Sequence, residues 1–256
     1  MIGIAINFGI SYDELSLANP EVNPNFLSVG AQLVIPLPTE TVDGDSPPET
    51  AVPEVLPLET GQALCYPVRS GGLWCYWLVS NSLPQPAENI AGVMRLYNNQ
   101  GEEIASQPAT SLLNLLPPGK SMPLAAYFPP PVGQWSSAQG QLLSAVEANQ
   151  AETRYLSAEL YNLSSEPISD DRLSFQISGR LGLPLPAAAD GSPAELTYAW
   201  VMATAYDADG AVVGLRRWEA PQEQLGPEIS FSFQVYSLGK PIETVELLTE
   251  SRTNLP

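Results

Sequence analysis

Short stretches of alternating apolar and polar residues, separated by turn residues, run through most of the sequence after Gly61. Such alternation puts apolar side chains on one face of a strand and polar side chains on the other. The chain also has 26 prolines and 19 glycines, which interrupt long helices. The pattern predicts a mainly β protein built from antiparallel β-sandwiches. The strand-like stretches are 73–81, 90–98, 140–148, 154–162, 173–181, 196–207 and 229–237.

Charge and the lack of histidine exclude several classes of function. The chain has 28 acidic and ten basic residues, for a net charge of -18. Nucleic acid and acidic lipid both need a basic face, so we predict neither as a partner. Without histidine, Ser-His-Asp, Cys-His and His-zinc sites are impossible. No apolar run reaches the roughly 18 residues that span a bilayer, so we predict no membrane span in this chain.

Residues 2–36 read differently from the rest of the chain. Apolar residues at helical spacing predict a first short helix that is followed by a tight turn. A Ser-x-x-Glu capping box over 11–14 begins a second helix, and the Asn19-Pro20 pair ends it. The sequence "QLVIP" at 32–36 predicts a short strand closed by its proline.

This stretch resembles a LysM domain in the order and spacing of its residues. The matching positions are Ile4-Ala5, Phe8-Gly9, Ser11, Leu15, Ala18-Asn19-Pro20, Leu27, Val29-Gly30, Leu33 and Ile35-Pro36. The resemblance implies a small, truncated α/β module over 1–38. It further implies binding of an N-acetylglucosamine-containing glycan, peptidoglycan or a chitin-like polymer. LysM proteins are usually exported, so it also implies an extracellular or cell-wall location.

A LysM domain usually opens with a strand and a Gly-Asp-Thr turn, and the resemblance begins after both. We therefore expect Met1 to be an internal methionine, with the first strand and an export signal encoded upstream. The alternative is a true start followed by a degenerate LysM remnant.

The glycan groove of LysM domains lies between the loop after the first strand and the loop before the second. The second loop corresponds here to "NPEVNPNFL", whose backbone would bind the N-acetyl group while its apolar side chains contact the sugar. The alternative is that these residues only shape the loop and cap the core. The candidate ligand residues are Asn19, Pro20, Glu21, Val22, Asn23, Pro24, Asn25, Phe26 and Leu27.

An internal repeat divides the rest of the chain. "VMRLYNNQGEEI" at 93–104 and "VMATAYDADGAVV" at 201–213 share a strand, a tyrosine, an Asn/Asp-rich turn and a glycine. The repeat predicts a first β-sandwich and a second β-sandwich after a proline- and acid-rich linker. The expected segments are a linker at 39–60 and sandwiches at 61–168 and 169–256.

The first copy of the repeat, with "LYNNQGEEI" and "LLPPGKSMPL", resembles the Ig-like FxLyD family. Asn98 stands where that family has aspartate, and the second copy keeps Asp207. The resemblance implies two Ig-like domains in which the motif is structural and carries no chemistry.

Cys65 and Cys75, the only cysteines, flank the turn-forming sequence 69–72 and could face each other across a hairpin. In an exported protein they would form a disulfide that closes a short loop, and in a cytoplasmic protein they would be buried thiols. The LysM resemblance favours the disulfide.

Other candidate sites have ordinary structural interpretations. "DADG" at 207–210 resembles part of a calcium loop but lacks the bidentate glutamate, so we read it as a hairpin turn. The acid pairs at 102–103 and 170–171 read as solvated surface. Asn162-Leu163-Ser164 matches a glycosylation acceptor that is frequent by chance. The tryptophans, at strand positions, should pack in cores, with an exposed sugar-stacking strip as the alternative. They are Trp74, Trp77, Trp135, Trp200 and Trp218.

Together these features predict a non-catalytic, exported carbohydrate-binding protein whose sandwiches serve as spacers or interaction modules. The alternative is a structural or protein–protein interaction protein with a vestigial LysM module, for which other surface proteins would be partners. We predict no catalytic residue, metal site or cofactor.

Overall fold

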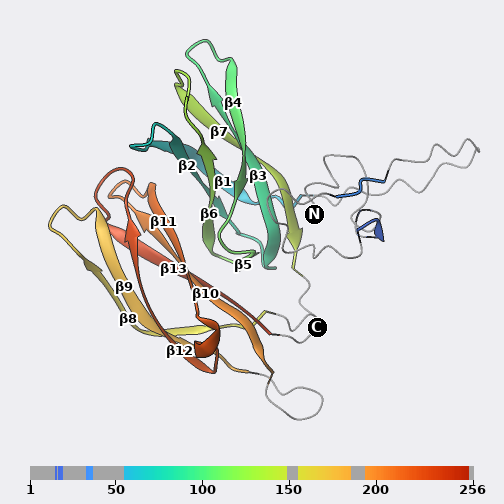
Figure 1. The fold of residues 1–256 in the computed structure, drawn as a ribbon, viewed down its shortest axis with the longest axis vertical. Helices are drawn as coiled ribbons and strands as arrows, with labels where there is room; N and C mark the ends of the chain where they lie inside the picture. The colour runs from blue at the N-terminus through green and yellow to red at the C-terminus, as the bar shows by residue number, and fades with distance from the viewer. Residues whose placement is uncertain are drawn as a thin grey trace, which may run out of the picture. The chain divides into compact units, whose positions relative to one another are not determined.

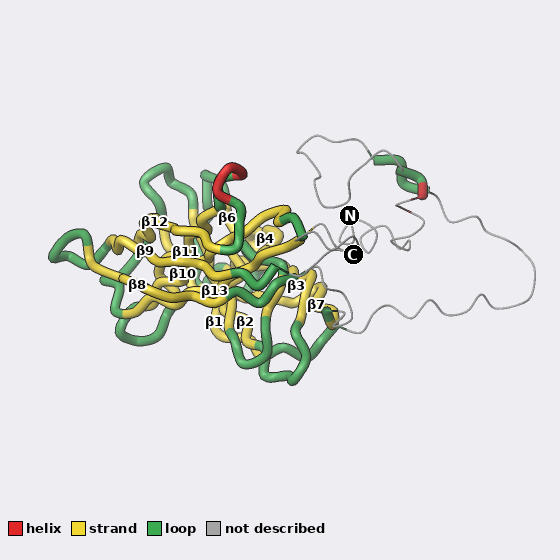
Figure 2. Tube along the Cα trace, turned by 90° about the horizontal axis from the view of Figure 1, so that it is seen from below, coloured by secondary structure: helices red, strands yellow, loops and turns green. Residues whose placement is uncertain are grey.

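The computed structural model describes residues 15, 17–19, 33–36, 55–148, 155–185 and 194–253. The chain divides into two compact units, Met1–Glu54 and Val55–Pro256. The second unit is mainly β, with antiparallel sheets throughout its described part, which confirms the predicted fold class at that level (Figures 1 and 2). Its helical element there is a single 3-10 turn, Gln222–Gln224.

The strands form two groups along the chain. We call the first group module A and the second group module B. Module A contains β1 (Glu59–Pro67), β2 (Leu73–Ser80), β3 (Ala87–Tyr97), β4 (Glu103–Thr110), β5 (Leu115–Leu116), β6 (Ser121–Phe128) and β7 (Ser137–Glu147). Module B contains β8 (Glu159–Pro167), β9 (Ser174–Gly182), β10 (Leu196–Tyr206), β11 (Val212–Glu219), β12 (Glu228–Tyr236) and β13 (Thr244–Thr253).

The sheet of module A runs β1-β2-β6-β4-β3-β5, and β7 pairs with β3. The link between β6 and β4 is a single residue pair, Thr110 with Ala125, so the two halves of the sheet can fold over one another. Trp77 of β2 shows that they do, because its ring lies against Gly92 of β3 and Gly140 of β7. A Cβ atom added at Gly140 would come within 2.2 Å of that ring. Glycine is therefore needed there for Trp77 to fill the core.

Module B consists of two three-stranded sheets, β11-β10-β13 and β12-β9-β8, that face each other. Their shared core joins Ile177 of β9 and Phe231 of β12 to Val201 and Ala203 of β10. The other face of β10 also carries apolar residues, and Met202 on that face belongs to the core cluster of module A. Strand β10 is thus covered on both faces, which explains its nearly continuous apolar sequence.

The sequence repeat corresponds to two matching hairpins, β3–β4 and β10–β11. Each has a register shift at its last pair and a left-handed glycine in the turn, Gly101 or Gly210. The Oδ1 atom of Asn98 accepts hydrogen bonds from the backbone N–H of Gln100 and Glu102. Asp207 accepts the equivalent pair from Asp209 and Ala211. Asparagine and aspartate can therefore replace each other in this turn, because in both copies the side-chain Oδ1 atom accepts the two backbone hydrogen bonds.

Two expected segment boundaries differ from the strand pairing. The boundary expected at 168/169 falls in the turn between β8 and β9, which pair along most of their length. That turn is a tight hairpin, whereas no change in composition marks the passage between β7 and β8. The linker expected to end at residue 60 overlaps the start of β1, and Leu58 before it is buried. The alternating stretches overlap β2, β3, β7, β8, β9, β10 and β12, whereas alternation does not predict β1, β4, β5, β6, β11 or β13.

Few residues of the first unit are described. Leu15 and Leu17 are helical and the chain leaves the helix at Asn19, as the Asn-Pro pair predicts, whereas the expected first helix and the capping box at 11–14 lie outside the described residues. Leu15 is fully buried while Leu17 is 81% exposed, as expected of a one-sided helix. The segment 33–36, which we predicted to be part of a strand, is not assigned as one. A strand is defined by ladder pairing, and the bonds described for Val34 go to a side chain instead.

Candidate functional site

Asn19, the first of the predicted glycan ligands, ties two segments of the first unit together. Its side-chain N–H groups donate to the carbonyl of Leu15 at 2.7 Å and to the carbonyl of Val34 at 2.8 Å. Its Oδ1 atom accepts from the backbone N–H of Val34 at 2.7 Å. The side chain is only 6% exposed, and both of its amide hydrogens are used. Asn19 therefore brings the two ends of the segment 20–33 together. The remaining predicted ligand residues, 20–27, lie outside the described residues.

The two cysteines form the predicted disulfide. Cys65 of β1 and Cys75 of β2 are directly paired across the hairpin, with Cα atoms 4.0 Å apart. Cys75 is fully buried in the core of module A. The bond therefore joins the edge strand to its neighbour at the end of the hairpin.

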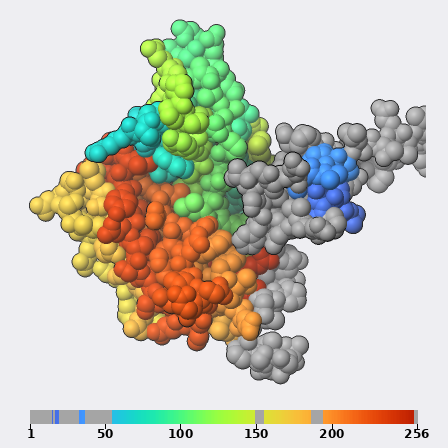
Figure 3. Space-filling view, in the orientation of Figure 1, coloured from blue at the N-terminus to red at the C-terminus, as the bar shows by residue number. Residues whose placement is uncertain are grey.

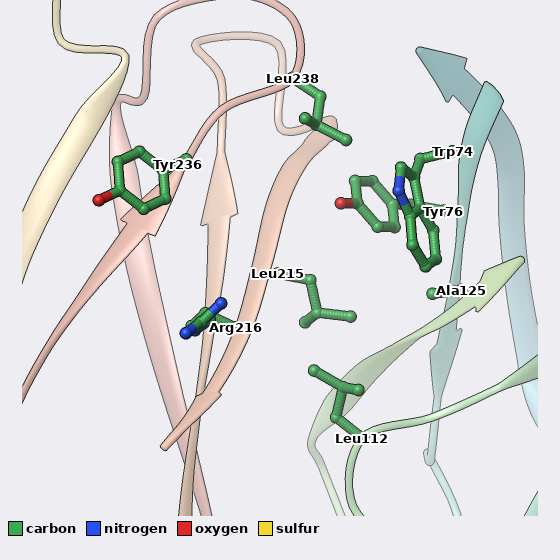
Figure 4. Close-up of a pocket in the computed structure, with 8 residues that line it drawn as sticks. All are labelled: Trp74, Tyr76, Leu112, Ala125, Leu215, Arg216, Tyr236 and Leu238. Atoms are coloured by element: carbon green, nitrogen blue, oxygen red, sulfur yellow. The ribbon is translucent and has the colours of Figure 1, made fainter. Parts of the chain in front are cut away.

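In Figure 3 the atoms of module A lie directly against those of module B. A groove lies between β2 and β6 of module A and β11 and β12 of module B (Figure 4). Trp74 and Tyr76 of β2 stand on one side of it, and Arg216 and Tyr236 stand on the other (Figure 4). Its volume is about 260 Å³. The lining residues are Trp74, Tyr76, Leu112, Ala125, Leu215, Arg216, Tyr236 and Leu238.

The aromatic residues of the groove differ in exposure. Trp74 is 37% exposed and Tyr236 is 54% exposed, whereas Trp77, on the opposite face of β2, is 3% exposed. Tyr76 is buried, and its burial raises the pKa of the phenol to about 12. The expectation that tryptophans pack in cores thus holds for Trp77 and not for Trp74. The indole ring of Trp74 packs against the ring of Tyr127 in a tilted arrangement, with ring centroids 5.1 Å apart.

Polar contacts fix the two walls of this groove to each other. Near one end, the Tyr66 hydroxyl of module A donates to the carbonyl of Val212 at 2.8 Å. Near the other, the Arg217 guanidinium of module B donates to the carbonyl of Leu112 at 2.6 Å. The guanidinium of Arg217 also stacks over Trp200, 4.0 Å from the ring centroid. These contacts cross between modules, so they hold the groove at a set width.

A buried carboxylate completes the junction. Glu250 of β13 is 2% exposed and accepts the backbone N–H groups of Asn114 and Leu115 in module A, at 2.6 and 2.8 Å. The Tyr198 hydroxyl donates to its other oxygen at 2.7 Å. Burial and the neighbouring Glu250 carboxylate raise the pKa of Tyr198 well above its usual value. Three donors thus compensate one buried charge at the contact between modules.

The Asp-rich turn at 207–210 is held by a lysine. Lys240 forms ion pairs with Asp207 and Asp209, and the Asp209 pair both lowers the pKa of that carboxyl and raises the pKa of Lys240. Within the described ranges, no group of three or more His, Cys, Asp or Glu residues could hold a metal ion.

The acid pairs at 102–103 and 170–171 take part in local structure. Glu102 accepts from the Asn98 side chain, and Glu103 pairs with Arg95. Asp171 accepts from the Ser169 hydroxyl and from the backbone N–H of Leu173, and these bonds lower the pKa of its carboxyl. Neither pair lines the groove.

Sequence reasoning did not identify the groove. Its residues come from five separate stretches of the chain, and their proximity depends on the packing of module A against module B. One feature of the sequence does point to a contact at this place. The β2 sequence "LWCYWLVS" is apolar at nearly every position, which indicates a strand covered on both faces. This pattern predicts that Trp74 and Tyr76 contact another element but does not identify that element.

Comparison with known proteins adds no family: the chain matches no family model and no curated protein. Among the described residues, no helix is long and apolar enough to cross a membrane.

Proposed function

We propose that the chain is a non-catalytic, exported glycan-binding protein. Its N-terminal segment resembles a LysM module and would bind an N-acetylglucosamine-containing glycan, peptidoglycan or chitin-like, through residues 19–27. The second unit serves as a rigid spacer or interaction module with an Ig-like arrangement of strands. The observation that carries the proposal is the position of Asn19, whose side chain bonds both Leu15 and Val34.

That geometry supports the proposal because a binding loop needs fixed ends. Asn19 leaves a helix whose inward residue, Leu15, is fully buried, and it bonds the segment 33–36 that follows the predicted loop. Fixing both ends lowers the entropy lost when a ligand orders the residues between them. With its side chain engaged, Asn19 would contact sugar mainly through its backbone.

The second unit supports export and a spacer role. A disulfide is typical of proteins that fold in an oxidising compartment. The polar contacts of Glu250, Tyr66 and Arg217 hold modules A and B together as one packed unit, in contrast to two domains that move independently on a flexible linker. A rigid second unit of this kind suits a spacer or interaction module.

The absence of catalysis is part of the proposal. A glycan hydrolase would place two carboxylates across a cleft. Here, among the described residues, Asp170 and Asp171 lie in a turn, Glu102 and Glu103 lie where a hairpin turn meets β4, and Glu250 accepts hydrogen bonds from three donors. Sugar release from purified peptidoglycan by the full-length protein would contradict this part of the proposal.

A sedimentation assay tests the binding. The full-length protein is mixed with purified peptidoglycan and, separately, with chitin, and the bound fraction is compared with that of Asn19→Ala. We expect the wild type to sediment with at least one polymer and Asn19→Ala to bind less, because three hydrogen bonds at the base of the loop are lost. Asn99→Ala, an exposed turn residue in module A, is the matched control and should bind like the wild type. Failure of the wild type to sediment with either polymer would reject glycan binding in favour of the protein-interaction alternative.

A further inference from the structure

We propose that the groove between modules A and B is a second glycan site, which takes a sugar residue that carries a carboxylate. The proposal rests on the glycan-binding function above and narrows it to an acidic amino-sugar polymer, in which neutral and carboxylate-bearing residues alternate. It starts from one side chain: Arg216, which lines the groove.

Arg216 differs from the other arginines of the described strands. Arg95, Arg180 and Arg217 each pair with a glutamate, and the guanidinium of Arg252 lies over the ring of Tyr155. Arg216 is exposed, and no described residue forms an ion pair or a hydrogen bond with its guanidinium. The chain holds 28 acidic residues and ten basic ones, so partners of opposite charge are abundant. A guanidinium left without one beside an aromatic groove is suited to a carboxylate on a ligand, which it binds through two parallel N–H donors.

The rest of the lining suits a sugar ring. Trp74 and Tyr236 present large exposed aromatic surfaces, and leucines at 112, 215 and 238 lie between them (Figure 4). The apolar C–H face of a pyranose packs on such surfaces while its hydroxyl groups stay in water. The volume of about 260 Å³ is below the range for drug-sized ligands, roughly 300–1,000 Å³, so the groove suits a ligand group of about one sugar ring.

The backbone of the groove argues against an extended peptide. Peptides that lie along a sheet usually add a strand to a free edge. Strand β2 has no free edge, because it pairs with β1 on one side and with β6 on the other. On the opposite wall, β11 and β12 are edge strands of their sheets, but these two edges lie against each other. The backbone N–H of Leu238 donates to the carbonyl of Val213, and Gly214 lies against the carbonyl of Tyr236. The walls therefore recognise a ligand through side chains, as expected for a ring bearing one anionic substituent.

The groove is also formed before any ligand binds. Its walls belong to different modules, and the contacts from Tyr66 to Val212 and from Arg217 to Leu112 hold them in place. A ligand would not have to order its own site, so little affinity is lost on binding.

Binding by the full-length protein is followed through the indole N–H signal of Trp74 in NMR spectra, assigned by its disappearance in Trp74→Phe. Three soluble probes are titrated: a neutral N-acetylglucosamine oligomer, an N-acetylglucosamine–N-acetylmuramic acid disaccharide, and the same disaccharide with its carboxyl group reduced. An acidic peptide with blocked ends is a fourth probe. Arg216→Gln is compared with Lys120→Gln, which removes an exposed positive charge from the turn before β6.

We expect the acidic disaccharide to shift the Trp74 signal, and the carboxyl-reduced disaccharide and Arg216→Gln each to weaken binding by about tenfold, the usual effect of losing one charge-assisted hydrogen bond. Lys120→Gln should bind within about twofold of the wild type. No shift of Trp74 by the disaccharide, equal affinity in Arg216→Gln, or a response to the peptide alone would overturn the proposal.

The same titrations separate the two sites. If the neutral oligomer shifts the amide signals of residues 19–27 while no probe affects Trp74, the second site is rejected and the LysM-like site stands. If the disaccharide shifts Trp74 in an Arg216-dependent way while residues 19–27 do not respond, the groove is supported and the LysM-like site is rejected.

Discussion

Replacing Glu250 with alanine should destabilise the second unit far more than the loss of an ordinary glutamate. The carboxylate is 2% exposed and accepts from the N–H groups of Asn114 and Leu115 and from the Tyr198 hydroxyl. Alanine leaves all three donors without an acceptor at the junction between modules. A buried donor left unpaired costs about 1–3 kcal/mol. Since water can enter the space vacated by the side chain, we expect a total loss of about 3–5 kcal/mol.

Urea unfolding of the full-length protein, followed by tryptophan fluorescence, measures this loss. Glu228→Ala is the matched control, because it also removes a glutamate from a strand but breaks only exposed contacts, an ion pair with Arg180 and a hydrogen bond with Tyr161. It should cost less than about 1 kcal/mol. Glu250→Gln should fall between the two, since its amide oxygen can still accept from Asn114 and Leu115 while its amide nitrogen donates to Tyr198.

Hydrogen exchange adds a local readout. In Glu250→Ala, the amide hydrogens of Asn114 and Leu115 should exchange faster than in the wild type, while amides inside the β9–β12 ladder keep their protection. A Glu250→Ala protein that unfolds at the same urea concentration as Glu228→Ala, with unchanged exchange at Asn114, would refute the assigned role of this carboxylate.

Three further predictions follow from the core and the hairpins. Reduction of the Cys65–Cys75 bond should lower the free energy of unfolding by about 2–3 kcal/mol, measured with and without reductant, and an unchanged midpoint would contradict its stabilising role. Gly140→Ala should destabilise by about 1–3 kcal/mol because its Cβ atom meets the ring of Trp77, whereas Gly133→Ala, with only a 3.6 Å contact, should be tolerated; equal denaturation curves would refute the packing account. The pKa of Tyr76 is about 12 in the folded protein and 10 in the unfolded chain. The stability that its neutral phenol contributes to the folded state is therefore complete below pH 10 and is lost as the pH rises toward 12. Tyr76→Phe should therefore unfold at higher pH than the wild type in an alkaline titration followed by circular dichroism, and an unchanged or lower unfolding pH would contradict the role of its ionisation.

The strands were predictable where one periodicity dominates. In β9 and β12 apolar and polar residues alternate, because one face meets the core and the other faces away, and the sequence shows it directly. The turns were predictable for a different reason: a left-handed backbone at Gly101 and Gly210 requires glycine in that place. Local chemistry was sufficient for both features.

The parts that were not predicted depend on packing between distant segments. The expected boundary at 168/169 separates β8 from β9, although the two strands pair. The sequence does not reveal this, because a hairpin turn at 168–173 and a linker between domains have similar compositions. Trp74 and Trp77 lie three residues apart in one strand, yet one faces the groove and the other fills a core. Which face is covered depends on module B, which begins many residues later in the sequence.

The most direct test of the proposed function is an NMR titration of the isotope-labelled, full-length protein with a neutral N-acetylglucosamine oligomer. If residues 19–27 bind the glycan, their amide signals should shift in a saturable way, and the side-chain amide of Asn19 should keep the protection given by its bonds to Leu15 and Val34. Signals from β9 and β12, in the core of module B, should stay in place. Spectra in which no signal between 19 and 27 moves at saturating oligomer would contradict the account.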